Sequence, residues 1–155
     1  MVLLLPGSRA QEIKRLLPAM LASAKLILAE RPDTVFFLPV AQGMDEALMQ
    51  RAVLRIGVQV AFCHGQVYEL MQAADFALAT SGTVVLEAAL LGLPCVILYR
   101  MSALSYLIAQ RFIHLHDFSL PNILAGKSIQ PELLQSEVNA PRIVREARRR
   151  YKGSP

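Results

Sequence analysis

A short loop near the start of the sequence combines residue types suited to binding phosphate. Gly7, Ser8 and Arg9 follow an apolar run and lead into a long helical pattern. Ser8 with Gln11 three residues later fits a capping box, which predicts that Ser8 begins the helix. Glycine lets the backbone approach a ligand closely, and arginine adds a bidentate cation beside a helix N-terminus that already favours anions. We interpret this loop as a candidate phosphate site.

A second loop of the same kind lies between an apolar strand pattern and an apolar helix pattern. Ser81, Gly82 and Thr83 offer hydroxyls and free backbone N–H groups at a helix start, which suits a diphosphate. The alternative is an ordinary helix cap. Glu87 favours the ligand, because a carboxylate in an otherwise apolar helix must be paired, hydrogen-bonded or facing a cleft. Sugar hydroxyls are suitable donors to it.

Two further polar positions follow other apolar runs. Arg100 comes directly after a predicted strand, and we expect it at the same edge as Ser81. The segment 117–123 reads as a polar loop. Within it, Asn122 either closes a turn after Pro121 or supplies amide hydrogen bonds to a ligand.

Other chemistries have no pattern in this sequence. There is no Ser/His/Asp triad spacing, no GxxxxGK[ST] loop and no GxGxxG. His64, His114 and His116 have no partners at ligand spacing, so no metal site is expected. Cys63 and Cys95 lie in apolar runs and are interpreted as buried thiols rather than a disulfide.

Strand and helix patterns alternate with short connections. Strands are predicted at 2–5, 34–39, 58–62, 76–79 and 95–98, and helices at 11–30, 45–55, 67–73, 83–91, 104–112, 131–136 and 141–151. This alternation predicts a Rossmann-like α/β fold, with a doubly wound parallel sheet and helices on both faces. Ligands of such sheets bind beyond the carboxyl ends of the strands.

Composition agrees with one buried sheet. The 155 residues are 54% hydrophobic, with a mean hydropathy of +0.41. The longest apolar run, 83–98, is interrupted by Glu87, Gly92 and Pro94, so no uninterrupted stretch of about 20 apolar residues is long enough to span a membrane. The first six residues lack the basic leader of a signal peptide, which favours a cytoplasmic location.

The positive charge is concentrated at one end of the chain. The formal net charge is +4, and the excess lies in Arg142, Arg145, Arg148, Arg149, Arg150 and Lys152. A basic helix of this kind is usually a solvated face, with an anionic membrane surface as the alternative partner. Nucleic acid is not expected, because no aromatic residues are interleaved to stack on bases.

The order of these motifs resembles the C-terminal half of lipid-A-disaccharide synthases. The resemblance runs from Leu4 to about Tyr151. It rests on Leu5-Pro6-Gly7-Ser8-Arg9 with Glu12, Ala79-Thr80-Ser81-Gly82-Thr83 with Leu86-Glu87, Tyr99-Arg100-Met101, Ser119-Leu120-Pro121-Asn122-Ile123-Leu124-Ala125-Gly126 and Pro131-Glu132-Leu133-Leu134-Gln135.

The resemblance implies a specific reaction. Such enzymes are GT-B glycosyltransferases that join UDP-2,3-diacylglucosamine to 2,3-diacylglucosamine 1-phosphate, without a cofactor or metal, at the inner face of the bacterial inner membrane. Residues 1–151 would then be the domain that binds the UDP donor, and 152–155 a disordered tail. The implied donor contacts are Gly7, Ser8, Arg9, Glu12, Ser81, Gly82, Thr83, Glu87, Arg100 and Asn122.

The resemblance also implies what this chain does not supply. The sequence opens directly on a strand and a phosphate-type loop, as a piece cut at a domain boundary would. The family's N-terminal half, which would bind the lipid acceptor and supply the catalytic base, is not in this sequence, so we expect no turnover by the chain alone. The apolar surface such a cut leaves would favour self-association.

Two other functions remain open from the sequence. A related UDP-sugar enzyme, such as a UDP-N-acetylglucosamine 2-epimerase or a murein-precursor transferase, would share the loops around Arg9 and Ser81 but should lack the Ser119–Asn122 segment. A non-catalytic module at a membrane surface would account for the apolar composition and the basic last helix.

Overall fold

Six parallel strands form a single sheet at the centre of the fold. The computed structural model describes residues 1–102 and 118–150. The strands are β1 (Val2–Leu5), β2 (Phe36–Val40), β3 (Ala61–His64), β4 (Phe76–Thr80), β5 (Cys95–Tyr99) and β6 (Glu132–Leu134). Their order across the sheet is β3-β2-β1-β4-β5-β6, and every described neighbouring pair is parallel. The predicted fold class is therefore confirmed.

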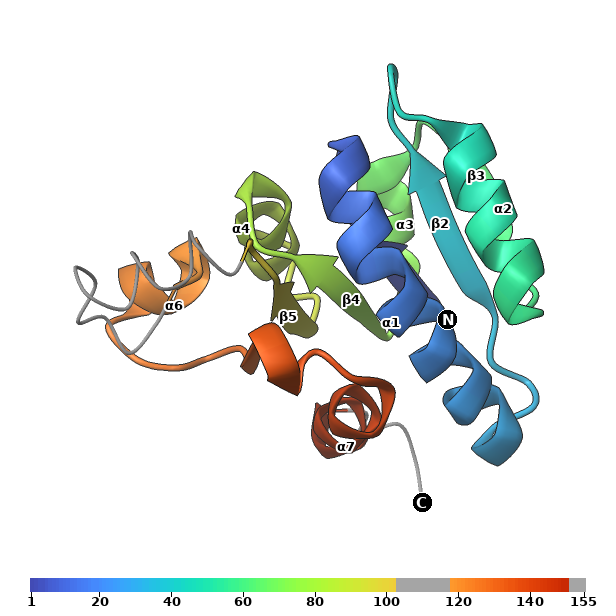
Figure 1. The fold of residues 1–155 in the computed structure, drawn as a ribbon. Coiled ribbons are helices and arrows are strands. Elements are labelled where there is room, and N and C mark those ends of the chain that lie inside the picture. The colour runs from blue at the N-terminus through green and yellow to red at the C-terminus, as the bar shows by residue number, and fades with distance from the viewer. Residues whose placement is uncertain (103–117, 151–155) are drawn as a thin grey trace.

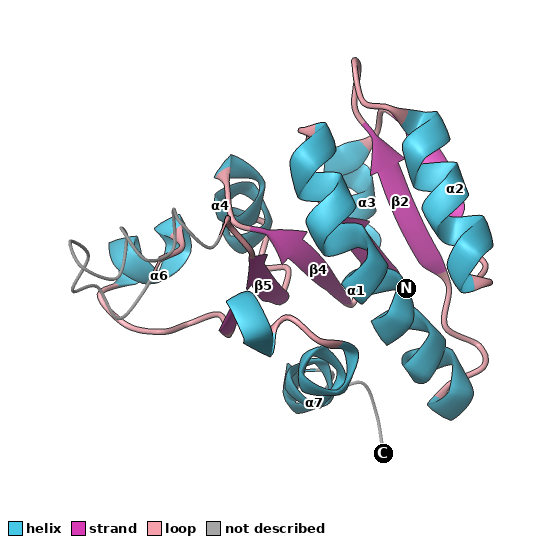
Figure 2. Cartoon of the chain, viewed as in Figure 1, coloured by secondary structure: helices cyan, strands magenta, loops and turns pink. Residues whose placement is uncertain are grey.

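Helices cover both faces of this sheet (Figures 1 and 2). They are α1 (Ala10–Glu30), α2 (Glu46–Ile56), α3 (Val67–Ala73), α4 (Thr83–Leu90), α6 (Leu120–Ala125) and α7 (Ala140–Arg150), with a 3-10 turn at Gln135–Glu137. One face packs against α1, α2 and α7, and the other against α3 and α4. Successive residues of each strand point to opposite faces, so the inner strands are apolar at almost every position, and Thr80 at the end of β4 is a buried polar exception.

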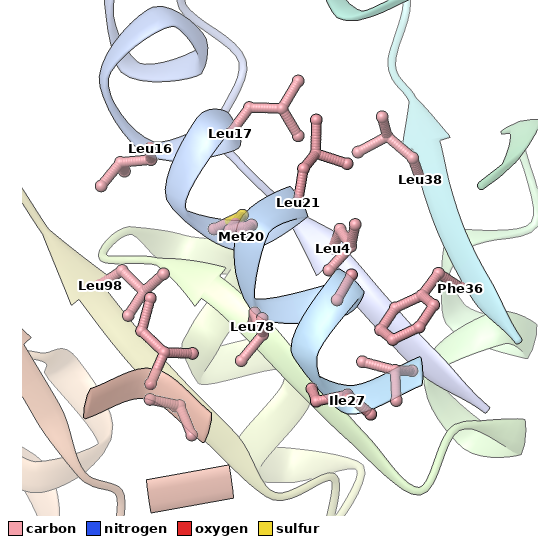
Figure 3. Packing of buried hydrophobic residues seen from close by; sticks show 14 of the residues in the cluster. Leu4, Leu16, Leu17, Met20, Leu21, Ile27, Phe36, Leu38, Leu78 and Leu98 are labelled. Carbon is pink, nitrogen blue, oxygen red and sulfur yellow. The ribbon is translucent and has the colours of Figure 1, made fainter. Parts of the chain in front are cut away.

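The larger core lies under α1. Its apolar stripe, which includes Leu17, Met20 and Leu21, packs on Leu4 of β1 and Leu38 of β2 (Figure 3). All five side chains are fully buried. The apolar stripe of α1 packs against the alternate strand residues that point to this face. Because β1 and α1 are both anchored in this core, the loop that joins them is held at the end of β1.

The strand order reverses direction between β1 and β4. From β1 the chain builds outward through β2 and β3, and it then crosses back to place β4 on the other side of β1. In open parallel sheets this switch point leaves a crevice beyond the carboxyl ends of the two strands. The loops that follow β1 and β4 contain Arg9 and Ser81, which are two of the predicted site residues.

Most predicted elements are present with small shifts. Strand β2 starts later than predicted, because its pairing with β1 begins where Phe36 meets Val2. Strand β3 likewise begins at Ala61, opposite Phe37, because the chain first leaves α2 through Gly57, whose φ is +70°. The predicted helix 104–112 lies outside the described residues, as do Asp117, His114, His116 and the predicted tail 152–155.

Two predictions near the C-terminus were wrong. Residues 131–136 were predicted to be a helix, but 132–134 form the edge strand β6, which pairs with β5 from Ile97 to Tyr99. Only Leu133 of the three is buried, an alternation typical of a strand. Residues 120–123 were predicted to be loop, but they begin α6. Ser119 at its N-cap, Pro121 in its first turn and Gly126 at its end are ordinary helix boundary signals.

Candidate functional site

A pocket of about 490 Å³ opens at the switch point of the sheet. It is formed by the ends of β1, β2 and β4 together with the starts of α1, α3 and α4. The structure brings seven of the ten predicted contacts to it: Gly7, Ser8, Arg9, Glu12, Ser81, Gly82 and Thr83. Glu87, Arg100 and Asn122 do not line it. Pro39, Ala41 and Met44 also line it, and none of them was predicted as a site residue from the sequence.

Gly7 is required at the floor of this pocket. Its φ is +95°, in the left-handed region that favours glycine. A Cβ at this position would clash with Oε2 of Glu12 and lie 3.1 Å from the methyl carbon of Thr80. The loop after β1 therefore packs directly against α1 and β4, which leaves its backbone open toward the pocket.

Helix α1 begins without a side-chain cap, contrary to the capping box predicted at Ser8. The N-cap residue is Arg9, whose side chain makes no capping hydrogen bond to the first turn. The Arg9 guanidinium lies 3.2 Å from the Glu12 carboxylate, one turn along the helix, and its side chain is 83% exposed. The N–H groups of the first turn and a solvent-exposed arginine are thus presented together at the pocket.

Helix α4 begins at the same pocket and is also without a side-chain cap. Its N-cap is Gly82, whose extended backbone carries no side chain to accept the first N–H groups. By contrast, α2 is capped by Asp45, whose carboxylate accepts from Leu48 N at 2.9 Å. Two helix N-termini, each with a partial positive charge, therefore face one pocket. This arrangement favours an anion between them.

Glu87 lies one turn after Thr83 on α4. Its side chain is half-buried and, within the part of the chain that the structure describes, it makes no hydrogen bond or ion pair. Residues four apart share a helix face, so Glu87 lies just beyond the pocket on the side that Thr83 marks. A half-buried carboxylate without a partner remains consistent with a ligand contact.

The Arg100 side chain is half-buried and hydrogen-bonds to backbone carbonyls of the protein. Its three guanidinium nitrogens donate to the backbone carbonyls of Arg15, Gln135 and Val138, at 3.2, 3.4 and 2.7 Å. These contacts join the end of β5 to α1 and to the turn before α7. Although Arg100 leaves the expected edge of the sheet, its side chain does not reach the pocket.

Asn122 is fully buried, and its amide hydrogen bonds are all made within the chain. Its nitrogen donates to Gln130 O at 2.8 Å and to the Glu132 carboxylate at 2.7 Å. Its oxygen accepts from the backbone N–H groups of Ile129 and Gln130, both at 2.9 Å. Neither reading of Asn122 from the sequence anticipated this arrangement, which leaves the amide no free donor in this structure.

Glu132 and Gln130 are the polar residues that the sequence reading missed. The Glu132 carboxylate accepts from the backbone N–H groups of Phe118 and Ser119 and from the Ser119 hydroxyl. Gln130 is buried and accepts from Cys95 N at 2.9 Å. The signal available was an acidic residue after Pro131, in a segment that the sequence wrongly predicted to be helical.

The basic residues of α7 are mostly paired within the fold. Arg148 bonds to Glu30 on α1, and Arg142 and Arg149 pair with Glu146 at 3.5 and 3.4 Å. Ile143, Val144 and Ala147 bury the other side of the helix, where α7 packs on α1. Of the described arginines of this helix, only Arg145 is exposed without an ion pair.

The described residues contain no disulfide, no metal-binding cluster and no membrane-spanning helix. Both cysteines are free, Cys95 buried and Cys63 half-buried. Among residues 1–102 and 118–150, no three His, Cys, Asp or Glu side chains are grouped to hold a metal ion. None of the described helices is long and apolar enough to cross a membrane.

Comparison with known proteins gives a consistent result. The family model of lipid-A-disaccharide synthetase matches residues 1–153. Lipid-A-disaccharide synthases from Syntrophus aciditrophicus and Geobacter metallireducens are 42% and 41% identical over 146 and 143 residues, or 94% and 92% of this chain. The one from Nitrosococcus oceani is 40% identical over 144 residues. These alignments cover only 38%, 37% and 37% of the relatives' own length.

Proposed function

The chain belongs to the lipid-A-disaccharide synthetase family, and on that premise we propose that it is the donor-binding domain of a glycosyltransferase of lipid A synthesis. In this proposal, residues 1–151 bind UDP-2,3-diacylglucosamine. The whole enzyme transfers the diacylglucosamine to 2,3-diacylglucosamine 1-phosphate, which gives the lipid A disaccharide precursor and UDP. The chain spans less than two fifths of the relatives it matches, so acceptor binding is assigned to the remainder of such an enzyme.

The observation that carries the proposal is the pair of uncapped helix N-termini at one pocket. The starts of α1 and α4 face the same 490 Å³ space, and Arg9 stands at its rim. A diphosphate placed there accepts hydrogen bonds from the first-turn N–H groups of both helices. Arg9 adds a charged donor: its side chain is 83% exposed and pairs with Glu12, one turn along the same helix.

The ribose is proposed to lie along α4. Thr83 is at the pocket and Glu87 is one turn farther on the same helix face. A carboxylate accepts hydrogen bonds from both hydroxyls of a ribose, and the Glu87 side chain has no competing partner among the described residues. Glu87 therefore provides the proposed selectivity for a nucleotide over a simple diphosphate.

The same groups account for the chemistry of the leaving group. When the acceptor hydroxyl attacks the anomeric carbon, the bond from that carbon to the β-phosphate oxygen breaks and negative charge grows on the departing UDP. Fixed N–H dipoles and an arginine stabilise that charge without having to reorganise. The base that removes the proton of the acceptor hydroxyl is assigned to a residue outside this chain.

The location follows from the substrates in this proposal. Donor and acceptor both carry acyl chains, so the reaction takes place at a membrane surface. We place it on the cytoplasmic face of the bacterial inner membrane, in line with the family resemblance.

Calorimetric titration of the chain with UDP tests the proposal. We expect UDP to bind more tightly than UMP, and Arg9→Ala to weaken UDP binding at least about tenfold. Glu87→Gln should weaken UDP but leave inorganic pyrophosphate unaffected. Arg145→Ala, which removes an exposed arginine on α7, is the matched control. An absence of UDP binding, or equal binding by wild type and Arg9→Ala, would refute the proposal.

A further inference from the structure

A second concave surface lies between α1 and α2, away from the donor pocket. It is a groove of about 380 Å³ with an apolar floor. The floor is formed by Ile13, Pro18, Leu48, Ala52 and Ile56. The two helices lie side by side on the same face of the sheet (Figure 1), so the groove follows the seam between them.

The rim of this groove is positively charged. Lys14 of α1 and Arg51 and Arg55 of α2 line it, and all three are exposed. Within the described ranges 1–102 and 118–150, none of the three makes an ion pair or a side-chain hydrogen bond. They differ in this from Arg142, Arg148 and Arg149 of α7, whose charges are balanced by carboxylates.

The acidic residues of the two helices all have partners elsewhere. Glu12 pairs with Arg9, and Glu30 pairs with Arg148. Asp45 caps α2, and Glu46 lies 2.8 Å from His64 of the edge strand β3. No carboxylate lines the groove, so its rim carries three uncompensated positive charges around an apolar floor.

An exposed leucine adds to this surface. Leu54 of α2 does not line the groove but lies outside it, next to Arg55 in the sequence and one turn from Arg51, and it is 80% exposed. Alternating basic and exposed apolar residues on a surface helix are typical of helices that lie in the interface of an anionic membrane. There the apolar side chain enters the boundary of the acyl chains while the cations meet lipid phosphates.

We propose that the α1–α2 groove, with Lys14, Arg51, Arg55 and Leu54, is a docking surface for a bilayer rich in acidic phospholipids. The positive charges of the rim favour anionic lipid headgroups. The apolar floor favours a lipid over a soluble anion, which would have no apolar part to bury there. We expect the membrane to contact this surface rather than α7, because the arginines of α7 that pair with carboxylates are less available to lipid. The inference does not depend on UDP binding.

Co-sedimentation with lipid vesicles tests the docking surface. The chain should pellet with vesicles of equimolar phosphatidylglycerol and phosphatidylcholine but not with pure phosphatidylcholine, and less at high salt. The double variant Arg51→Gln/Arg55→Gln should bind about thirty-fold more weakly. The control Lys127→Gln/Arg145→Gln makes the same charge change on exposed residues elsewhere and should bind like wild type.

Three further measurements decide the outcome. Leu54→Ser should weaken vesicle binding without changing its salt dependence, and UDP titration should be unchanged in all these variants. Equal loss in both double variants would mean that net charge alone drives binding, which would overturn the proposal. Equal binding to both vesicle types, or displacement from vesicles by inorganic phosphate at matched ionic strength, would overturn it as well.

Discussion

The side-chain nitrogen of Asn122 lies 2.7 Å from a carboxylate oxygen of Glu132, and this hydrogen bond joins α6 to the edge strand β6. The same carboxylate accepts the backbone N–H groups that precede α6. Gln130, whose N–H and carbonyl both bond to Asn122, accepts in turn from Cys95 N of β5. A continuous polar network therefore connects α6 to an inner strand of the sheet.

Asn122→Ala is predicted to act on folding rather than on the ligand. The substitution leaves the buried N–H of Gln130 and the half-buried N–H of Ile129 without an acceptor, which should lower the free energy of unfolding by about 2–4 kcal/mol. UDP affinity of the remaining folded protein should change less than about threefold, because Asn122 does not line the pocket. Chemical denaturation and calorimetry measure the two quantities.

Asn139→Ala is the matched control for that prediction. Asn139 is exposed and caps the start of α7, accepting from Arg142 N at 3.1 Å. Loss of an exposed cap costs only about 1 kcal/mol. If Asn122→Ala left stability unchanged but abolished UDP binding, Asn122 would be a ligand contact in a conformation other than this one.

Gly7→Ala is predicted to distort the donor pocket. The added methyl group would need to displace Glu12 while the backbone keeps a φ of +95°. We expect a loss of about 1–3 kcal/mol in stability and at least tenfold in UDP affinity. Gly43→Ala separates the two causes, since Gly43 has a φ of +83° but open space around it. It should lose stability only. Equal UDP affinity in both variants would contradict the role given to the loop.

The sequence predicted the sheet and the pocket because their signals are local. Apolar runs such as 76–79 are typical of strands buried on both faces of a parallel sheet, and the Gly-containing loops after β1 and β4 follow the carboxyl ends of neighbouring strands. The loops around Arg9 and Ser81 are therefore brought together, as predicted. The uncapped start of α1 was not predicted, because Ser8 has the composition of a cap but the chain places Arg9 at that position.

The environment of Asn122 and Arg100 could not be read in the same way. Their partners are backbone carbonyls and N–H groups on other elements, and no residue type signals a backbone partner. The edge strand β6 was missed for a related reason. Three residues with one buried leucine carry too little pattern, and pairing with β5 decides their conformation.

The two cysteines are predicted to differ sharply in reactivity. Burial raises the pKa of the Cys95 thiol to about 12, because the thiolate would lose its hydration. At pH 8 only roughly one Cys95 in ten thousand is then ionised, and it is also inaccessible. A thiol reagent should modify one cysteine in the native protein and two after unfolding. Rapid labelling of native Cys63→Ser would contradict this prediction.

The ion pair between α1 and α7 is predicted to be visible in a pH titration. The hydrogen bond from Arg148 and its charge hold the pKa of Glu30 below its ordinary value. A depressed carboxylate pKa stabilises the fold above the unfolded-state value, and this stabilisation is lost as the pH falls through the folded-state value. Carbon-13 NMR titration should show the Glu30 pKa rising in Arg148→Gln. An unchanged value would mean that the pair does not persist in solution.

The junction between β1 and β4 also determines when the pocket comes into existence. Five helices and strands separate these two strands in the chain, so their pairing brings together segments that are far apart in the sequence. A partly folded chain in which β1 and β4 are not paired contains the loops that follow these two strands, but the pocket between the loops is not formed. A ligand held by both loops therefore selects molecules in which β1 and β4 are paired, and raises their free energy of unfolding with the logarithm of its concentration. Saturating ligand would thus favour the molecules in which this pairing is made, and ligand-dependent stability would measure how completely the sheet is assembled.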